Sequence, residues 1–487
     1  MKEADVKARP DRWLFTAFLL LLAWLPLPWG SNTSWAVSIA GMAVFLLLAW
    51  WGLLLVAGRV TWPLRLSRFA VPLLLWALWL AWVVVQTVSL PPDVLAAISP
   101  SSFAVHQEVA RLDATDPIYS ISIAPGQTWA KWYLNWIYLG IYLLTVLLLR
   151  TDSRLRVVLL VLLLSGLFQA AYGGLMTLSG IEYGFFAKKA YYLRAATGTF
   201  VNRNHLAGYL EMTAAAGMGL VLADLRGVGG WGWRALVDGL LNLMLSTKLR
   251  VRLALVVIAI GLVLTRSRMG NLAFFGSVSL CGLGYVVLRE RQMFFRALLL
   301  FASILVVDVL IINQWFGLDR VIERIDATRI EKEGRAQLLK EIGPVVAAYR
   351  ETGAGLGSFA YAYEPYRSGA MHEYMDHAHN DYVEFLVEAG IPGFGLLVAL
   401  VGVHLLHALR VILRRRHRLK VAACFSVVTA SVALGIHATA DFNFQIPANA
   451  ATYVVFLGIA ASCSSRSRSK RRRSEAGEAV TPAVPAA

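Results

Sequence analysis

The sequence predicts an all-α protein that crosses a membrane many times, and three observations lead to this fold class. The chain of 487 residues is 58% hydrophobic and 16% charged, whereas soluble proteins carry about 25% charged residues. Apolar runs close to twenty residues long recur along it, and a helix of about 20 apolar residues crosses a hydrocarbon core of about 30 Å. Basic residues punctuate these runs. We therefore expect a polytopic membrane protein and not a soluble domain with a buried core.

The apolar runs give about twelve spans. The first, "WLFTAFLLLLAWLPLPW" at 13–29, is too long and aromatic for a removable signal peptide and lacks a small-residue cleavage site. We therefore interpret it as a transmembrane helix. The spans are expected near residues 13–30, 36–57, 70–90, 130–149, 155–178, 205–224, 251–265, 270–288, 297–315, 393–413, 421–440 and 447–463.

Basic residues set the orientation of these spans. The net charge of +16 is spread over alternate short loops, which is typical of the cytoplasmic side of a membrane protein. This spacing, without a single basic patch, argues against nucleic-acid binding, and it places both termini in the cytoplasm. The basic clusters are Lys2, Lys7, Arg9 and Arg12; Arg59, Arg65 and Arg68; Arg150, Arg154 and Arg156; Arg226, Arg234, Lys248, Arg250 and Arg252; Arg289, Arg291 and Arg296; Arg410, Arg414, Arg415, Arg416, Arg418 and Lys420; and the tail at 466–473.

The resulting organisation has four parts. Residues 1–315 hold the first nine spans and an outer loop at 91–128. Residues 316–392 form a large outer loop between the ninth and tenth spans, and this loop ends in a short helix that breaks at Gly390 and Pro392. Residues 393–463 hold the last three spans. Residues 464–487 form a basic cytoplasmic tail whose composition predicts disorder.

Polar residues gather at the outer ends of the spans, in three stretches. In "HAHND" (377–381), His379 directly precedes a helix, and His377 lies two residues earlier in what we expect to be a more flexible loop. The other stretches are "VNRNH" (201–205) and "TRSR" (265–268). Arginine at membrane depth is costly and usually has an anionic partner or a functional role. The alternative is that these arginines extend to the lipid head groups.

These residue types suit transfer of a glycosyl group from a lipid-linked sugar diphosphate. The forked guanidinium group matches phosphate oxygens. Histidine, with an ordinary pKa near 6.5, can accept a proton from a hydroxyl group at neutral pH. Since arginines could neutralise the leaving diphosphate, which a metal ion does in other enzymes, we expect a metal-independent reaction without a cofactor.

At these stretches the chain resembles the O-antigen ligase and O-antigen polymerase superfamily of bacterial envelope enzymes. His379-Asn380 is followed by Gly390, which fits the family pattern His-[Asn/Ser/Gln]-x9-Gly. The turn at 265–270 is similar to the family's TxSRG turn, although Met269 stands where the family often has glycine. The stretch 200–207 fits F-x-N-x-N-x-x-A, and "GAGLGSFAYAYEPYR" at 353–367 also resembles the family's outer loop.

The resemblance implies a GT-C-like architecture in the bacterial inner membrane, with a periplasmic active site and an undecaprenyl-diphosphate-linked glycan as donor. It implies that His379, Arg268 and Arg203 are the catalytic positions. The acceptor stays open among a lipid A core, a growing glycan of an O-antigen or exopolysaccharide, and a protein. Residues expected to bind substrate are Arg266, Asn380, Asn204, His205 and Arg194, which is an alternative to Arg203.

Two other functions deserve comparison. His377, His379 and Asp381 match the start of an H-x-H-x-D metallo-hydrolase signature, but Tyr382 stands where that signature needs a histidine, and the signature belongs to soluble α/β domains. The cysteines, Cys281, Cys424 and Cys463, show no paired spacing that would indicate zinc or a disulfide framework. A twelve-helix transporter would usually place its polar groups near the midplane and show internal repeats, and neither occurs here.

Overall fold

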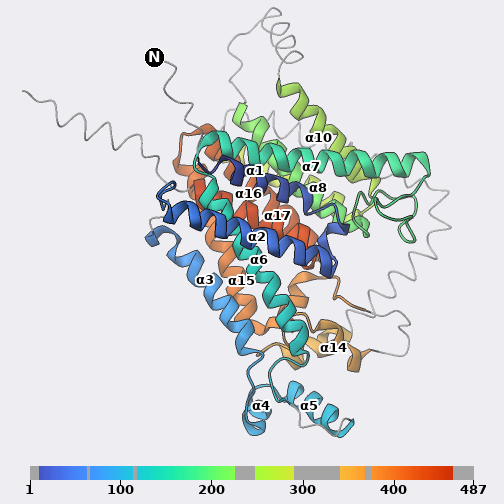
Figure 1. Ribbon diagram of the computed structural model, residues 1–487. Helices are drawn as coiled ribbons and strands as arrows, with labels where there is room; N and C mark the ends of the chain where they lie inside the picture. Colours follow the sequence, from blue (N-terminus) through green and yellow to red (C-terminus); the bar gives the residue numbers. More distant parts are fainter. Residues whose placement is uncertain are drawn as a thin grey trace, which may run out of the picture.

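The computed structural model describes residues 10–62, 66–112, 118–224, 247–289, 341–367 and 375–463 (Figure 1). Within these ranges regular structure is helical, apart from one isolated bridge between Tyr183 and Lys188. Seven of the described helices are long and apolar enough to cross a membrane. Three shorter apolar helices, Arg12–Trp24, Phe69–Val85 and Pro447–Cys463, accompany them. The chain is therefore an all-helical, polytopic membrane protein.

The helices fall where the apolar runs predict them. Eleven of the twelve predicted spans have a corresponding helix, and the twelfth, at 297–315, lies outside the described residues. The helices that correspond to spans are α1 (Arg12–Trp24), α2 (Ser34–Val56), α3 (Leu66–Val85), α6 (Pro125–Leu148), α7 (Asp152–Ser179), α8 (Arg203–Asp224), α10 (Thr247–Leu264), α11 (Arg268–Arg289), α15 (Asp381–Arg414), α16 (Arg418–His437) and α17 (Pro447–Cys463).

The predicted outer loop at 91–128 is not plain coil. It contains α4 (Pro92–Ile98) and α5 (Pro100–Leu112), which project beyond the bundle from the ends of α3 and α6 (Figure 1). His106 of α5 is buried and its Nε2 lies 2.9 Å from the carbonyl oxygen of Ser120. This contact ties α5 back to the chain that enters α6.

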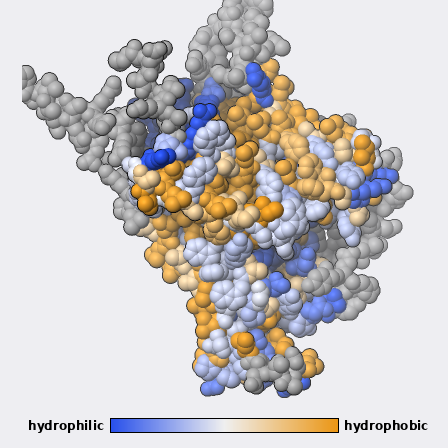
Figure 2. All heavy atoms as spheres, viewed as in Figure 1, coloured by the Kyte–Doolittle hydropathy of each residue, from blue (hydrophilic) through white to orange (hydrophobic). Residues whose placement is uncertain are grey.

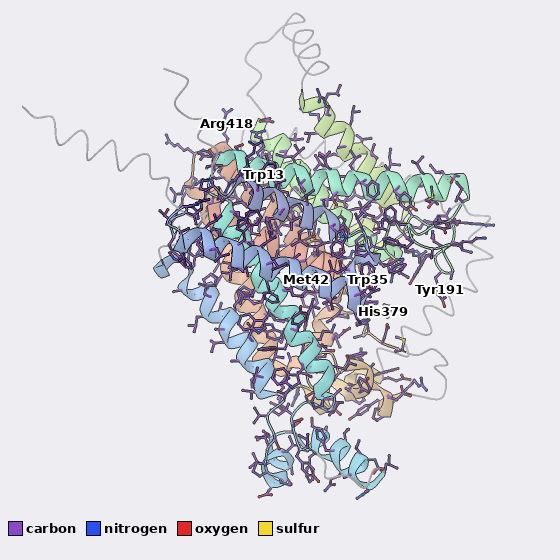
Figure 3. All side chains as sticks on the ribbon, viewed as in Figure 1. Trp13, Trp35, Met42, Tyr191, His379 and Arg418 are labelled. Atoms are coloured by element: carbon purple, nitrogen blue, oxygen red, sulfur yellow. The ribbon has the colours of Figure 1, made fainter. Side chains whose placement is uncertain are left out.

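Within the described residues, basic side chains from three of the predicted clusters, Arg154 and Arg156, Arg289, and Arg415, lie at one end of the bundle. Arg418, at the start of α16, and His379, just before α15, lie at opposite ends (Figure 3). Contacts at the Arg418 end join helix termini that are distant in sequence. These contacts are Arg156–Asp224 at 2.9 Å, His417–Asp152 at 2.9 Å, Arg154–Asp11 at 2.7 Å, and Arg289 Nη2 to the Arg415 carbonyl oxygen at 2.9 Å.

The centre of the bundle is built from small residues and one fully enclosed helix. In α17 every residue except Ser462 is buried. Between α8 and α16, a Cβ added at Gly219 would lie 1.9 Å from Ser426 Oγ, so these helices approach as closely as glycine permits. Small residues let helices in lipid pack by close contact. The outer face is apolar instead, with Leu46 64% and Leu53 69% exposed on α2; much of the upper surface in Figure 2 is hydrophobic.

Helix α15 is two helices joined at a kink, as the glycine and proline in the sequence predict. Gly390 has φ +64° and ψ −179°, a conformation that favours glycine. The kink frees two carbonyl groups, which need new donors where water is scarce. Trp82 Nε1 donates to Ala389 O at 2.8 Å, and Gln86 Nε2 donates to Glu388 O at 2.8 Å. Trp82 of α3 and Gln86, which directly follows α3, therefore hold the first part of α15, which carries the residues after His379.

The described part of the large loop packs against the same short helix. Residues 341–349 are helical, a glycine-rich turn follows, and α14 (Phe359–Tyr363) ends the segment. Ala354 N donates to Val387 O at 2.8 Å, and Gly355 N donates to Glu388 O at 3.0 Å. The "GAGLGSF" stretch therefore supports the start of α15 from outside the bundle.

Candidate active site

The candidate site is the place where four separate segments meet at the end of the bundle opposite Arg418. The segments are the start of α8, the turn between α10 and α11, residues 377–388, and the connection 438–446 between α16 and α17. The connection folds into a turn and the short 3-10 helix η4 (Asn443–Gln445), and Pro447 then begins α17. This turn places Asp441 and Phe442 among the histidines.

The ring of Phe442 is surrounded by three histidines. His377 stacks on it, with ring centroids 4.1 Å apart and an interplanar angle of 18°. His205 and His379 meet it edge-on, at 4.6 and 5.0 Å. Three histidines from two parts of the chain are therefore gathered around one aromatic side chain.

Asp441 is a buried carboxylate next to two of the histidines. It is 1% exposed, and its Oδ1 lies 3.7 Å from His379 Nδ1 and 3.9 Å from His205 Nε2. Burial by itself would raise the pKa of Asp441, but the neighbouring rings of His379, His205 and His437 hold that pKa well below its usual range. Asp441 is therefore an anion at neutral pH, placed to stabilise a proton on a neighbouring imidazole.

Backbone contacts fix His379 in place. Its φ is +47°, which is uncommon for a residue with a Cβ. Asn380 caps α15 by accepting hydrogen bonds from the amides of Tyr382 and Val383, and its Nδ2 donates to Thr439 O at 3.0 Å. The cap and the connection 438–446 therefore hold the backbone on the C-terminal side of His379. Its side chain is 37% exposed, the most accessible of the three histidines.

His377 occupies a different environment. Its Nδ1 lies 2.7 Å from Glu384 Oε1, and its side chain is 20% exposed. Burial by itself lowers the pKa of His377, but the hydrogen bond and charge of Glu384 outweigh this effect and raise that pKa. Glu384 and the stacked Phe442 ring both contact His377, and its greater flexibility relative to His379 stays a prediction. Since its Nδ1 is engaged by Glu384, His377 is less available to a substrate than His379.

The start of α8 contributes Arg203, Asn204 and His205. His205 is packed in the site as described above, and its side chain is 8% exposed. Arg203 is half-buried, with its Cζ 5.5 Å from the centre of the Tyr192 ring. The amide of Asn204 donates to Asn202 Oδ1 at 2.8 Å. Of the predicted residues in this stretch, His205 is thus in contact with the histidine cluster, and Arg203 borders the segment before α8.

The predicted arginine turn adjoins the start of α8. Arg266 has φ +55° and is half-buried, whereas Arg268 begins α11 and is exposed. A Cβ added at Gly270 would lie 2.6 Å from the Cβ of Ala207, so the turn packs directly on α8. Arg194 lies in the segment between α7 and α8, with an exposed side chain and its amide bonded to Glu182 Oε1 at 2.6 Å. The structure therefore brings these arginines to the same end as His379.

A second layer of buried polar residues lies beneath the site. His437 and Glu211 are fully buried, with 2.7 Å between Nδ1 and Oε1. Asn449 Nδ2 donates both to His205 O and to Asn443 Oδ1, each at 3.0 Å. These contacts join α8, α16 and α17 directly below the histidines and fix the backbone that carries His205.

Sequence reasoning missed several residues of this site. Asp441, Phe442 and Glu211 belong to none of the motifs described above. Glu384 lies in the first turn of α15, and its carboxylate binds His377 and the backbone amide of Ala378, the latter at 2.9 Å. The signal in the sequence that could have identified these residues is the occurrence of acidic residues together with histidines at the outer ends of the spans.

The described side chains of the site are not arranged as a set of metal ligands. No grouping of three or more histidine, cysteine, aspartate or glutamate side chains has the geometry to hold a metal ion there. Within the suspected H-x-H-x-D motif, His377 binds Glu384, and Asp381 Oδ2 accepts from the amide of Phe444 at 3.1 Å. The three side chains of that motif therefore have separate partners.

Comparison with known proteins supports the resemblance of the motifs. Residues 253–398 match the family model of the O-antigen ligase domain, Wzy_C. The matched range contains the arginine turn, the glycine-rich loop and His379, while the start of α8 and Asp441 lie outside it. A search of curated proteins finds no match. Residues 253–398 are therefore similar to the O-antigen ligase domain family.

Proposed function

We propose that this protein transfers a glycan from an undecaprenyl-diphosphate-linked donor to an acceptor hydroxyl group, at the end of the bundle that carries His379. The observation that carries the proposal is the position of His379. It is the most exposed histidine of the site, it lies 3.7 Å from the buried Asp441 carboxylate, and it stands within the region that matches the ligase family.

In the proposed reaction, His379 accepts the proton of the acceptor hydroxyl group. The freed oxygen forms a bond to the anomeric carbon from the face opposite the diphosphate, and the bond between that carbon and the diphosphate oxygen breaks. The electron pair of the broken bond leaves with undecaprenyl diphosphate, so the configuration inverts. Asp441 stabilises the imidazolium that forms, and Arg268 and Arg203 neutralise charge on the leaving group.

The orientation in the membrane is part of the proposal. Arg154, Arg156, Arg289 and Arg415 lie at the Arg418 end, which positive charge favours for the cytoplasm, so the His379 end faces the periplasm of a bacterial inner membrane. Cysteine substitution and labelling with an impermeant reagent tests this orientation. We expect labelling of a cysteine at position 379 from the periplasm and of one at position 418 from the cytoplasm, and the reverse pattern would overturn the orientation.

The acceptor is tested by direct assay. Purified protein is incubated with a lipid-linked repeat unit and, in turn, with a lipid A core, a second repeat unit or an acceptor protein. We propose the lipid A core, the acceptor of a ligase, and the other two would make the protein a polymerase or a protein glycosyltransferase. His379→Ala should reduce transfer by about 10²–10⁴, while His417→Ala, a change to a half-exposed histidine at the opposite end of the bundle, should not. Transfer at the wild-type rate in His379→Ala would contradict the mechanism.

A further inference from the structure

The segment between α7 and α8 has an unusual distribution of polar and apolar side chains. Residues 181–194, here called the 181–194 hairpin, carry one bridge between Tyr183 and Lys188. The hairpin is held by a charge pair. Lys189 Nζ lies 2.6 Å from Glu182 Oε2, and these side chains are 6% and 12% exposed. The ion pair is therefore inside the hairpin.

The apolar side chains of the hairpin point outward instead. Ile181 is 57% exposed, Phe186 49%, Tyr191 72% and Leu193 57%. A loop in water would place these residues inside and its charges outside. Lys188 and Arg194 are exposed, but the exposure of four large apolar side chains around a buried ion pair indicates that the outer surface of the hairpin faces an apolar environment. The last turns of α7 continue that surface, because Leu175 and Leu178 are 63% and 69% exposed.

The backbone conformation of the hairpin fixes the outward orientation of these apolar side chains. Glu182, Phe185, Tyr192 and Arg194 all have positive φ values, between 54° and 66°. Side chains with a Cβ rarely adopt this conformation, and they do so where the surrounding structure holds them. Glu182 provides that hold, because its carboxylate accepts from the Lys189 side chain and from the amide of Arg194, each at 2.6 Å.

The apolar surface is continuous with one of the candidate arginines. Tyr192 lies between the exposed Tyr191 and Leu193, and the guanidinium carbon of Arg203 lies 5.5 Å from the centre of its ring. Arg203 Nε is buried and makes no hydrogen bond to any described residue. Figure 3 shows Tyr191 and His379 toward the same end of the molecule. The apolar surface of the hairpin therefore adjoins Arg203, and both lie toward the same end of the molecule as the histidine site.

We propose that the 181–194 hairpin binds the isoprenoid chain of the lipid-linked donor and thereby holds its diphosphate at Arg203. The ligand that fits is long and apolar with a charged diphosphate at one end. Charge complementarity supports this occupant, since Arg203, Arg194 and Lys188 border the apolar surface and all carry positive charge. The inference rests on the proposed function, because it assumes that the donor is a polyprenyl diphosphate.

The experiment compares donors that differ only in chain length. The double variant Tyr191→Ser/Leu193→Ser removes two apolar side chains that face outward from the hairpin. Its KM for an undecaprenyl-diphosphate-linked glycan should rise roughly tenfold, equivalent to about 1.4 kcal/mol. Its KM for the same glycan on geranyl diphosphate should change less than about twofold (a difference of about 0.4 kcal/mol). Equal changes for both donors, or no change for either, would overturn the proposal.

A matched control lies at the same end of the molecule on α5. Val109 and Leu112 are 51% and 81% exposed, and α5 lies well away from the end of α7 (Figure 1). The variant Val109→Ser/Leu112→Ser should leave the KM unchanged for both donors. A rise for the long-chain donor in this variant as well would show a general effect of lipid contact and would contradict the proposal.

A binding experiment separates this inference from the proposed function. A photoreactive polyprenyl diphosphate, without acceptor, should label the hairpin in the wild-type protein and in His379→Ala. Undecaprenyl diphosphate should compete with the label, whereas phosphatidylglycerol vesicles should not. Competition by the phospholipid, or labelling confined to other segments, would overturn the inference. Labelling of the hairpin in a protein that transfers no glycan to any acceptor would support the inference and contradict the proposed reaction.

Discussion

Replacing Asp441 with asparagine tests the central contact of the site, because it removes the charge and keeps the shape. Asp441 Oδ1 lies 3.7 Å from His379 Nδ1. At an effective dielectric constant of about 20, a pair of unit charges at that distance interacts by about 4.5 kcal/mol. Each 1.36 kcal/mol changes a rate about tenfold, so the full interaction corresponds to roughly 10³ in kcat.

Solvent reduces this value. The His379 side chain is 37% exposed, and water screens a charge pair at such a surface, so we expect a loss of about 10²–10³ in kcat. The measurement is transfer under saturating lipid-linked donor, with donor binding measured separately. Binding should stay within about twofold (0.4 kcal/mol), because the carboxylate does not contact the diphosphate in the proposed reaction.

The control is Asp376→Asn, which changes an exposed carboxylate one residue before His377. It should leave kcat within about twofold of the wild type (a barrier change of about 0.4 kcal/mol). If Asp441→Asn transferred glycan as fast as this control, Asp441 would have no part in stabilising the protonated His379. If it lost donor binding and not turnover, Asp441 would belong to the donor site.

Four further predictions follow from the same contacts. His379→Ala should reduce turnover by about 10²–10⁴, the usual contribution of a general base, while His377→Ala should keep a substantial part of the activity; equal losses would reject the assignment. Arg268→Lys should lose most transfer activity although the charge survives, because an ammonium group does not reproduce the forked contact with a diphosphate; near-normal turnover would make Arg268 an interface residue. Activity should survive chelation of divalent ions, and loss of activity that one specific ion restores would contradict this. Because Glu384 raises the pKa of His377, the difference in Tm between wild type and His377→Gln should be largest below about pH 6.5 and should shrink as pH rises through the folded pKa; a difference that does not change with pH would reject the ion pair.

The membrane helices could be predicted from the sequence because two independent signals agree. Apolar length locates a span, and arginine placement tells which spans end together. The kink at Gly390 was also predictable, since glycine and proline stand two residues apart in "GIPG". The donors that stabilise the kink, Trp82 and Gln86, were not, because nothing local to α3 links it to a turn that lies 300 residues later in the chain.

The site itself was predicted in part. The motifs identified His379, the arginine turn and the start of α8, and the structure brings these to one end of the bundle. Asp441 and Phe442 were not assigned to the site, because they come close to His379 only when the connection 438–446 folds against it. Their distance along the chain carries no information about that contact, and no described helix has a periodicity that would reveal it.

The burial of α17 has a consequence for how the protein is made. Its residues other than Ser462 are all buried among other helices, yet the ribosome synthesises α17 after every other described helix. The helices that enclose it therefore enter the bilayer first and have to leave a gap for it to occupy. Until α17 arrives, the connection 438–446 has no anchor on its C-terminal side, so the nascent chain acquires its histidine cluster only at this late insertion step.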